Sequence, residues 1–219
     1  MTPRRKTDDV RLKAAILGAA FERVVFDGFT DKVLAVAARK VGANKILVAR
    51  LFPKGALSLI EAFSHEADTQ MEQSLRSVAL KRMKVRERIE AAVKARIAAL
   101  RPHKEAARRA AAFLSLPPHA ALGAKLVYRT VDAMWRAAGD TSTDFNFYTK
   151  RAILAGVYTS TLVRWFTDTT DDDVETTRFL NDRIENVMQF EKFKATLRQG
   201  MAGFPSLSQL LAAVELRRS

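Results

Sequence analysis

The sequence predicts an all-α fold. Glycine and proline, the residues that most often interrupt helices, number only 9 and 6 among 219 residues. Alanine and leucine recur at helical spacings that place them on one side of a helix, and no stretch alternates as a half-buried strand does. Hydrophobic residues make up 48% of the chain and charged residues 28%, which are ordinary values for a globular protein with a buried core.

The N-terminal part of the chain is predicted to contain a flexible segment, residues 1–10, and a module of short helices, residues 11–62. Gly28 and Gly42 are placed to end helices, because glycine readily adopts the left-handed conformation found there. Thr30 is placed to cap the helix that follows it. The predicted helices of this module span about residues 11–27, 31–41 and 44–51.

Residues 63–203 are predicted to form a larger helical body. The helix predicted over about residues 146–167 is the least polar, so we expect it to lie at the centre of the domain. Three aspartates, residues 171–173, are expected in the first turn of the next helix, where carboxylates favour the positive end of the helix dipole. The predicted helices after the module span about residues 56–80, 85–100, 104–116, 119–138, 146–167 and 171–200.

The last segment, residues 204–219, is predicted to be a separate amphipathic helix after Pro205, capped by Ser206 and Gln209. Such a helix can lie in a membrane surface, or it can dock on its own domain or on a second subunit, and both interpretations stay open. Its apolar side and cationic end are formed by Phe204, Leu207, Leu210, Leu211, Val214, Arg217 and Arg218.

Positive charge is unevenly distributed. The chain has a formal net charge of +13, and residues 1–110 hold 24 basic and 12 acidic side chains. Residues 76–109 alone carry twelve basic side chains against three acidic ones. So dense a stretch attracts polyanions such as nucleic acid or the anionic face of a membrane, although a solvated helix face explains it equally well.

No pattern in the sequence predicts catalysis. The absence of cysteine excludes disulfides, thiolate zinc sites and cysteine nucleophiles. His65, His103 and His119 lie far apart, and no phosphate-binding, zinc-protease or nucleophile-elbow motif occurs. The polar loop 140–144 is best explained as a turn and a helix cap. We therefore expect no enzymatic activity, metal or cofactor. Because no apolar run is long enough to span a membrane, we also expect a soluble protein.

The three N-terminal helices, with the turn at Gly42, have the spacing of a helix-turn-helix and resemble the N-terminal module of TetR-type regulators. In that module the third helix enters the major groove of DNA. Here Ile46, Leu47 and Val48 occupy that helix, so few side chains remain to contact bases or phosphates. We therefore expect no specific DNA binding. A TetR-type regulator with a small-molecule ligand remains the alternative.

A second resemblance rests on residues 139–158, which read Gly-Asp-Thr-Ser-Thr-Asp-Phe-Asn-Phe-Tyr-Thr-Lys-Arg-Ala-Ile-Leu-Ala-Gly-Val-Tyr. This run is similar to the signature of the coenzyme Q biosynthesis accessory family, the TetR-like lipid-binding partner of the demethoxyubiquinone hydroxylase. Residues 51–63, 85–109 and 178–188 resemble the same family, and the match extends over roughly residues 10–200.

The resemblance implies a non-catalytic homodimer on a TetR-like helical fold. Members of the family hold isoprenoid quinone precursors or other lipids in an apolar pocket, contact the membrane through the last amphipathic helix and present substrate to the hydroxylase. The resemblance also implies a location. In a bacterium the protein would be cytoplasmic and peripheral on the inner membrane, and in a eukaryote it would lie on the matrix side of the mitochondrial inner membrane. In both cases it would contact an anionic membrane surface.

The resemblance also implies two groups of site residues. The candidates for docking the hydroxylase are Asp132, Asp144, Phe147, Tyr148 and Arg151. The candidates for binding lipid are Met134, Trp135, Val157, Leu162, Trp165, Phe166, Leu180 and Val187.

Overall fold

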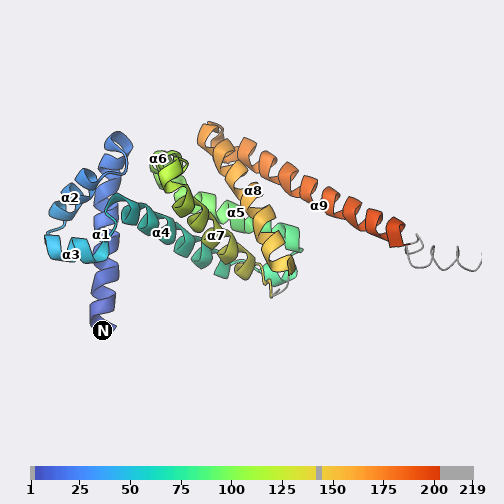
Figure 1. Cartoon of the computed structure of the whole chain (residues 1–219), viewed down its shortest axis with the longest axis horizontal. Helices are drawn as coiled ribbons and strands as arrows, with labels where there is room; N and C mark the ends of the chain where they lie inside the picture. Colours follow the sequence, from blue (N-terminus) through green and yellow to red (C-terminus); the bar gives the residue numbers. More distant parts are fainter. Residues whose placement is uncertain (1–2, 142–144, 203–219) are drawn as a thin grey trace, which may run out of the picture.

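A computed structural model describes residues 3–141 and 145–202, and over these residues the chain forms helices and no strand (Figure 1). The predicted all-α class is confirmed. The α-helices are α1 (Pro3–Asp27), α2 (Asp31–Lys40), α3 (Lys45–Leu51), α4 (Ala56–Arg76), α5 (Val85–Leu100), α6 (Lys104–Leu114), α7 (Ala120–Ala137), α8 (Phe145–Thr167) and α9 (Val174–Ala202).

Helices α1–α3 form a module at one end of the molecule, and α4 leads from it into the body formed by α4–α9 (Figure 1). The predicted Thr30 cap is present, because its hydroxyl oxygen accepts a hydrogen bond from the amide of Val33 at 3.2 Å. Asn44, predicted as the first residue of its helix, caps α3 instead and accepts a hydrogen bond from the amide of Leu47 at 2.8 Å. Gly42 has a φ of +71° at the end of α2, the conformation expected of a glycine there. The module packs on the body through contacts of α1 with α4 and α6.

Helix α1 begins at Pro3 and so includes residues that the sequence placed in a flexible segment. Proline suits the first position of a helix, because the amide hydrogen that it lacks has no partner inside the helix. Asp9 then fixes this first part of α1 to α3, since both of its carboxylate oxygens accept hydrogen bonds from Arg50 at 2.6 Å. The two helices are thereby linked outside the apolar core.

Helix α8 is not buried all round, so the prediction of a central position is wrong for the single chain. One side of α8 packs on α7 and α9 and buries Leu154, Tyr158 and Trp165. The opposite side leaves Tyr148 66% and Val163 65% exposed. Between them on this side lie Ala152, Gly156, Thr159 and Ser160, and the two hydroxyls donate hydrogen bonds to backbone carbonyl oxygens of the same helix.

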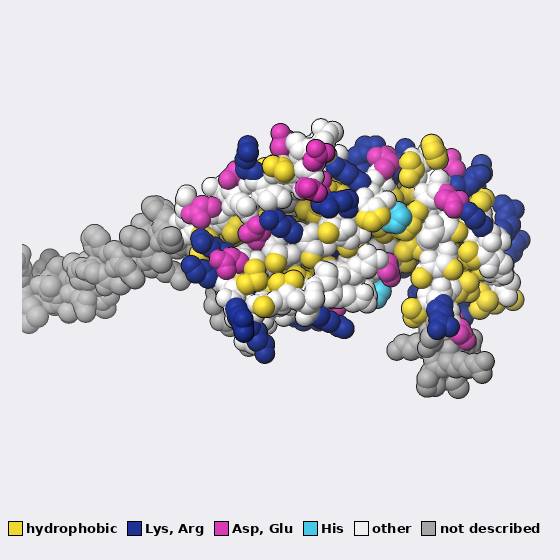
Figure 2. Space-filling view, turned by 180° about the vertical axis from the view of Figure 1, so that it is seen from behind, with side chains coloured by type: hydrophobic (Ala, Val, Ile, Leu, Met, Phe, Trp, Pro, Cys, Tyr) yellow, Lys and Arg dark blue, Asp and Glu magenta, His cyan; other side chains and the backbone are white. Residues whose placement is uncertain are grey.

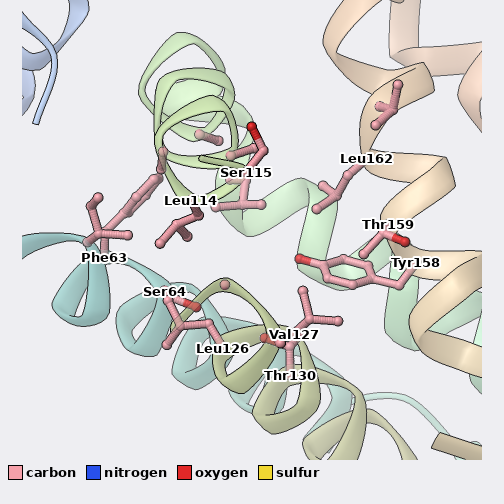
Figure 3. Close-up of a pocket in the computed structure, with 18 of the residues that line it drawn as sticks. Phe63, Ser64, Leu114, Ser115, Leu126, Val127, Thr130, Tyr158, Thr159 and Leu162 are labelled. Carbon is pink, nitrogen blue, oxygen red and sulfur yellow. The ribbon is translucent and has the colours of Figure 1, made fainter. Parts of the chain in front are cut away.

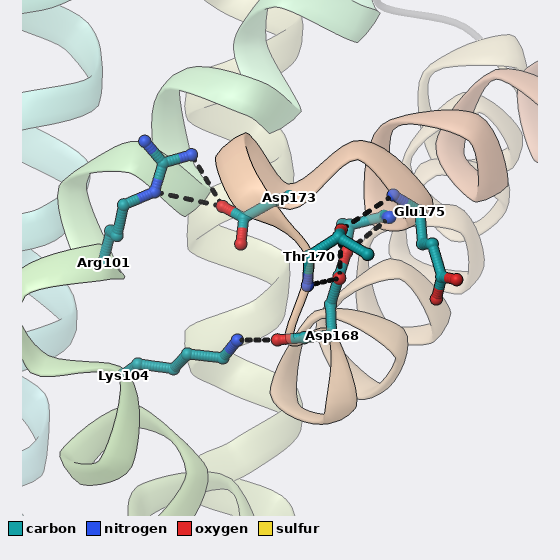
Figure 4. A network of polar contacts seen from close by, with 7 residues as sticks. Arg101, Lys104, Asp168, Thr170, Asp173 and Glu175 are labelled. Carbon is teal, nitrogen blue, oxygen red and sulfur yellow. Dashed lines mark hydrogen bonds and ion pairs between the residues drawn. The ribbon is translucent and has the colours of Figure 1, made fainter.

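The aspartates at 171–173 form a short 3₁₀ turn ahead of α9 instead of the first turn of the helix itself. Asp172 and Asp173 both have a φ of +55°, which breaks the helical path. Asp173 accepts hydrogen bonds from Arg101 at 2.6 and 3.0 Å, so this turn is oriented by an ion pair with the body (Figure 4). A tertiary contact here overrides the local preference of carboxylates for a helix start.

The turn between α8 and α9 is fastened to α6 through Asp168 (Figure 4). The Asp168 carboxylate accepts hydrogen bonds from the amides and hydroxyls of Thr170 and Thr176, at 2.6 to 2.9 Å. Lys104, at the start of α6, donates to the carbonyl oxygen of Asp168 at 2.6 Å. Desolvation by itself would raise the pKa of Asp168, but these hydrogen bonds outweigh it and hold that pKa well below the ordinary value.

Candidate functional site

A cavity of about 380 Å³ lies among α4, α5, α6, α7 and α8 (Figure 3). Its volume falls in the range of small-molecule binding sites. The lining is mostly apolar, and Figure 3 shows Leu114, Leu126, Val127 and Leu162 around the space. Exposed lining residues such as Ser115 and Val163 mark an outer end, whereas Ile60 and Phe63 are buried and mark an inner end. An apolar ligand could therefore enter from the outer end.

Polar groups are gathered at the buried end of this cavity. Arg96 is only 3% exposed, and its Nε lies 3.1 Å from Asp68 Oδ1. Thr130 donates a hydrogen bond to the same Asp68 oxygen at 2.8 Å, and Arg96 Nη2 donates to Ser64 Oγ at 3.2 Å. Tyr158 projects from α8 toward α4 and α7 in Figure 3. Burial raises the pKa of its hydroxyl, so this hydroxyl keeps its proton at neutral pH.

A second hollow, of about 370 Å³, lies among α5, α7, α8 and α9. It is also mainly apolar, with Ile89, Ile153 and Ile184 in its lining. Helix α8 contributes different residues to the two spaces, such as Leu162 and Phe166 to the first and Ile153 and Leu154 to the second.

The predicted lipid-binding residues are divided among three places. Leu162 and Phe166 line the cavity between α4 and α8. The second hollow is lined by Trp135, Val157 and Val187. Met134, Trp165 and Leu180 are at most 1% exposed, belong to the packed core and line neither space. Arg96, Ser64 and Tyr158 were not among the sequence candidates, because their position at the cavity depends on how distant helices pack.

The candidate docking patch, which we define as Asp132, Phe147, Tyr148 and Arg151, is brought together by α7 and the first turns of α8. Arg151 is 3% exposed, and its Nε donates to Asp132 Oδ1 at 2.8 Å. Its central carbon lies 3.3 Å from the centroid of the Phe147 ring. Tyr148 stands 66% exposed beside Phe147, with the ring centroids 5.1 Å apart. An exposed aromatic residue thus rests on a buried ionic support.

Asp140 and Lys150 belong to this support but were not among the sequence candidates. Asp140 accepts hydrogen bonds from Arg151 Nη1 at 3.2 Å and from Lys150 Nζ at 2.8 Å. This aspartate was predicted to be part of a turn, and its ion pair with Arg151, eleven residues further along the chain, depends on how α8 packs after that turn. Trp135 adds a hydrogen bond from its indole nitrogen to the carbonyl oxygen of Lys150 at 3.1 Å. Asp144 lies outside the described residues.

The basic residues of segment 76–109 do not form one continuous face. Arg96 is buried, Arg88 donates to the carbonyl oxygen of Ala138 at 2.9 Å, and Lys104 is bound to the turn after α8. Exposed basic side chains remain together at the connection between α4 and α5, where they are Arg76, Lys81, Arg82, Lys84 and Arg86. Figure 2 shows another group of basic side chains over the N-terminal module.

On α3, the helix that corresponds to a DNA-reading helix, Ile46 is 82% exposed. Arg50 of the same helix is engaged by Asp9. Within residues 3–141 and 145–202, no helix is long and apolar enough to cross a membrane. The seven predicted membrane-contacting residues between 204 and 218 lie outside the part of the chain that the structure describes.

Comparison with solved structures supports the TetR-like fold. A TetR transcriptional regulator from Nitrosomonas europaea superposes with a TM-score of 0.64. The alignment covers 80% of this chain and 97% of the regulator, at 20% sequence identity. At this identity the likeness shows the fold alone, and it confirms the predicted TetR-like class.

Comparison with protein families and curated proteins gives a consistent result. A family model described as COQ9 matches residues 120–191. The mitochondrial ubiquinone biosynthesis protein COQ9 of Homo sapiens is 32% identical, over 95% of this chain and 70% of that protein. The protein of the same name from Rattus norvegicus is also 32% identical, over 95% of this chain and 71% of its own length. The chain therefore belongs to the COQ9 family of ubiquinone biosynthesis proteins.

Proposed function

We propose that this protein is a non-catalytic accessory protein of ubiquinone biosynthesis, which binds an isoprenoid quinone precursor or another lipid and presents it to a membrane-associated hydroxylase. The observation that carries the proposal is the apolar cavity of about 380 Å³ between α4 and α8, in a chain of the COQ9 family. Apolar pockets with a few converging polar groups are the usual form of small-molecule sites.

The docking patch supports the second part of this proposal. Tyr148 is a large aromatic side chain that stays mostly exposed, although Arg151, which stacks on the neighbouring Phe147 ring, is nearly fully buried. Exposed aromatic residues held by a rigid base are frequent anchors of protein interfaces. The patch is built on α8, the same helix that lines the cavity with Leu162 and Phe166. A partner bound at the patch would therefore contact an element of the lipid site.

The exposed side of α8 further supports a homodimer. It presents the exposed residues Ala152 and Gly156, which lie between the docking patch at Tyr148 and the outer end of the cavity at Val163. Small residues allow two helices to approach closely, and contiguous apolar surface of this kind commonly marks an interface. Ala152→Arg would place a charge in that interface without altering either apolar space, so we expect the variant to elute as a monomer in size-exclusion chromatography with light scattering.

Native mass spectrometry after gentle purification tests lipid binding directly. We expect a lipid or isoprenoid to remain bound to the unmodified protein. Ala111 lines the cavity, whereas its neighbour Ala112 is exposed on the other side of α6. Ala111→Phe should fill the space and lower the fraction of protein with bound lipid, while Ala112→Phe should leave that fraction unchanged. A protein that carries no lipid before and after incubation with quinone-containing vesicles would contradict the proposal.

A further inference from the structure

Arg96 has an unused hydrogen-bond donor at the cavity. A guanidinium group carries five N–H donors, and burial without a partner costs each of them the hydrogen bond to water that it would otherwise make. Arg96 Nη2 donates to Ser64 Oγ, and Nε lies 3.1 Å from Asp68 Oδ1. Nε and Nη1 are both buried, and neither makes a hydrogen bond of good geometry among the residues that the structure describes, although the Tyr158 hydroxyl lies beside the guanidinium. Because Arg96 lines the cavity, a bound molecule can supply the missing acceptor.

The charge around Arg96 indicates which acceptor fits. The guanidinium is already balanced by Asp68, which is 8% exposed and also receives a hydrogen bond from Thr130 at 2.8 Å. A carboxylate or phosphate next to Arg96 would add a second negative charge close to Asp68 in a buried site, where repulsion is only weakly screened. A neutral oxygen, such as the carbonyl of a ring or an ester, accepts a hydrogen bond from Arg96 without that repulsion.

The position of Arg96 gives the orientation of such a ligand. The polar groups Arg96, Ser64 and Tyr158 stand at the buried end, and the remaining wall is mostly apolar, with Ser115, Thr130 and Thr159 as its other polar residues. The outer end lies near Ser115 and Val163, which are exposed. A polar headgroup would therefore lie inside, and an apolar tail would extend toward the outer end.

We propose that the cavity binds an amphiphile with its headgroup inward, and that Arg96 Nη1 donates a hydrogen bond to a neutral carbonyl oxygen of this headgroup. Asp68 is a positioning residue that fixes the guanidinium and compensates its charge. The inference rests on the proposed lipid-binding function and specifies the headgroup chemistry, which is a neutral carbonyl such as that of a quinone.

Three probes with matched tails test the headgroup chemistry: decylubiquinone, decanoate and decylbenzene, each added from detergent micelles to the full chain. We expect the unmodified protein to bind decylubiquinone more tightly than decanoate. Binding of decylubiquinone is measured by its quenching of tryptophan fluorescence, and binding of the other probes by their competition with decylubiquinone. Tighter binding of decanoate would overturn the assignment of a neutral acceptor. Fatty-acid methyl ester added as a fourth probe distinguishes a quinone carbonyl from an ester carbonyl.

The variant that tests Arg96 is the double substitution Arg96→Met with Asp68→Asn, which removes both charges together and leaves no buried ion unpaired. We expect it to bind decylubiquinone about 10-fold more weakly, the effect of losing one hydrogen bond to a charged donor, and to bind decylbenzene unchanged. Lys94→Met is the matched control, because Lys94 lies two residues earlier on α5, is exposed and pairs with Glu90 outside the cavity. Equal quinone affinity in the double variant and the unmodified protein would refute the inference but leave the proposed function intact.

A measurement on the unmodified protein covers the case in which the double variant does not fold. Infrared difference spectra of decylubiquinone with ¹³C-labelled carbonyls report the hydrogen bond directly. We expect one carbonyl band of the bound quinone to shift to lower wavenumber than in detergent alone. Bound quinone with two unshifted carbonyl bands would overturn the inference. Failure of the unmodified protein to bind any of the probes would instead contradict the proposed lipid-binding function.

Discussion

Arg151 holds Phe147 from two directions. Its guanidinium carbon lies 3.3 Å from the centroid of the Phe147 ring, and its Nη1 donates a hydrogen bond to the Phe147 carbonyl oxygen at 3.1 Å. A cation over the face of an aromatic ring is attracted by the negative charge of that face. The start of α8 is therefore fixed before any partner binds, and Tyr148 is presented on a rigid support.

Tyr148→Ala should weaken binding of the hydroxylase without altering the stability of the fold. The side chain is 66% exposed, so its truncation removes little buried surface. Aromatic anchors of interfaces typically contribute about 2 kcal/mol, which corresponds to roughly 30-fold in the dissociation constant. Titration calorimetry with the purified hydroxylase measures this effect. Phe26→Ala, which removes a 79% exposed aromatic side chain from α1, is the control and should bind normally.

Arg151→Met should destabilise the fold, because it leaves Asp132 and Asp140 without their shared buried cation. Removing one partner of a buried ion pair typically costs about 3 kcal/mol. Arg136→Met is the matched control, since Arg136 pairs with the same Asp132 at 3.2 Å but its side chain is 66% exposed. We expect the control to lower the free energy of unfolding by less than about 1 kcal/mol. Urea denaturation distinguishes the two, and equal losses would contradict a structural role specific to Arg151.

The sequence predicted the elements whose ends are set by neighbouring residues. Helix α5 spans Val85–Leu100 as predicted, and Thr30 caps α2 because its hydroxyl is only three residues from the amide it binds. By contrast, α4 ends at Arg76, before the predicted residue 80, and a short 3₁₀ turn follows at Leu80–Arg82. This difference arises from the connection to α5, where Arg88 binds the carbonyl oxygens of Lys81 and Met83.

The candidate site was predicted only in part, for a similar reason. The resemblance to a family identified Asp132, Phe147 and Arg151, which the fold brings into contact. The contact between Arg96 and Asp68 joins two helices, and the two residues are 28 positions apart in the sequence, so no local sequence pattern reveals this contact. A periodic apolar pattern likewise cannot separate Leu162, which lines a cavity, from Trp165, which is fully buried in the core.

Asp168→Asn should reduce stability in a manner that depends on pH. The carboxylate accepts four hydrogen bonds, and its pKa in the folded state lies below the value of about 3.9 expected in the unfolded chain. The contribution of a carboxylate with a lowered pKa is fully present above the unfolded value and is lost as the pH falls below it. We expect a loss of about 2 kcal/mol at pH 7 that shrinks as the pH falls from about 4 toward 3.

Urea denaturation between pH 3 and pH 7 measures the Asp168 effect. Asp171→Asn serves as the control, because it removes the carboxylate of a neighbouring aspartate that is exposed. A stability difference between Asp168→Asn and the unmodified protein that stays constant over this range would show that the ionised carboxylate is not responsible.

Specific DNA recognition is not expected of this chain. Ile46 occupies an exposed position of α3, and Arg50 on the same helix is held by Asp9. Any affinity for DNA should come from phosphate contacts by exposed basic residues and should fall steeply as salt is raised. Electrophoretic mobility shifts with random DNA fragments at low and physiological salt test this. A sequence-specific footprint that persists at physiological salt would favour the TetR-type regulator instead.

Removal of residues 204–219 should reduce binding of the protein to anionic liposomes. Phe204, Leu207, Leu210, Leu211 and Val214 provide apolar side chains whose complete burial is worth roughly 1.5–3 kcal/mol each, so partial burial of several supports reversible attachment. Arg217 and Arg218 add about 1 kcal/mol each near an anionic surface, a contribution that salt screens.

Co-sedimentation with liposomes separates these contributions. Arg217→Gln combined with Arg218→Gln should weaken liposome binding at low salt and have little effect at high salt. Leu210→Ser combined with Leu211→Ser should weaken binding at both, since burial of apolar surface is not screened. Circular dichroism and light scattering of the truncated protein provide the control for folding and assembly. Unchanged liposome binding by a truncated protein that has become monomeric or unfolded would assign this segment to the dimer or the core, and membrane contact would then have to come from the exposed basic residues between α4 and α5.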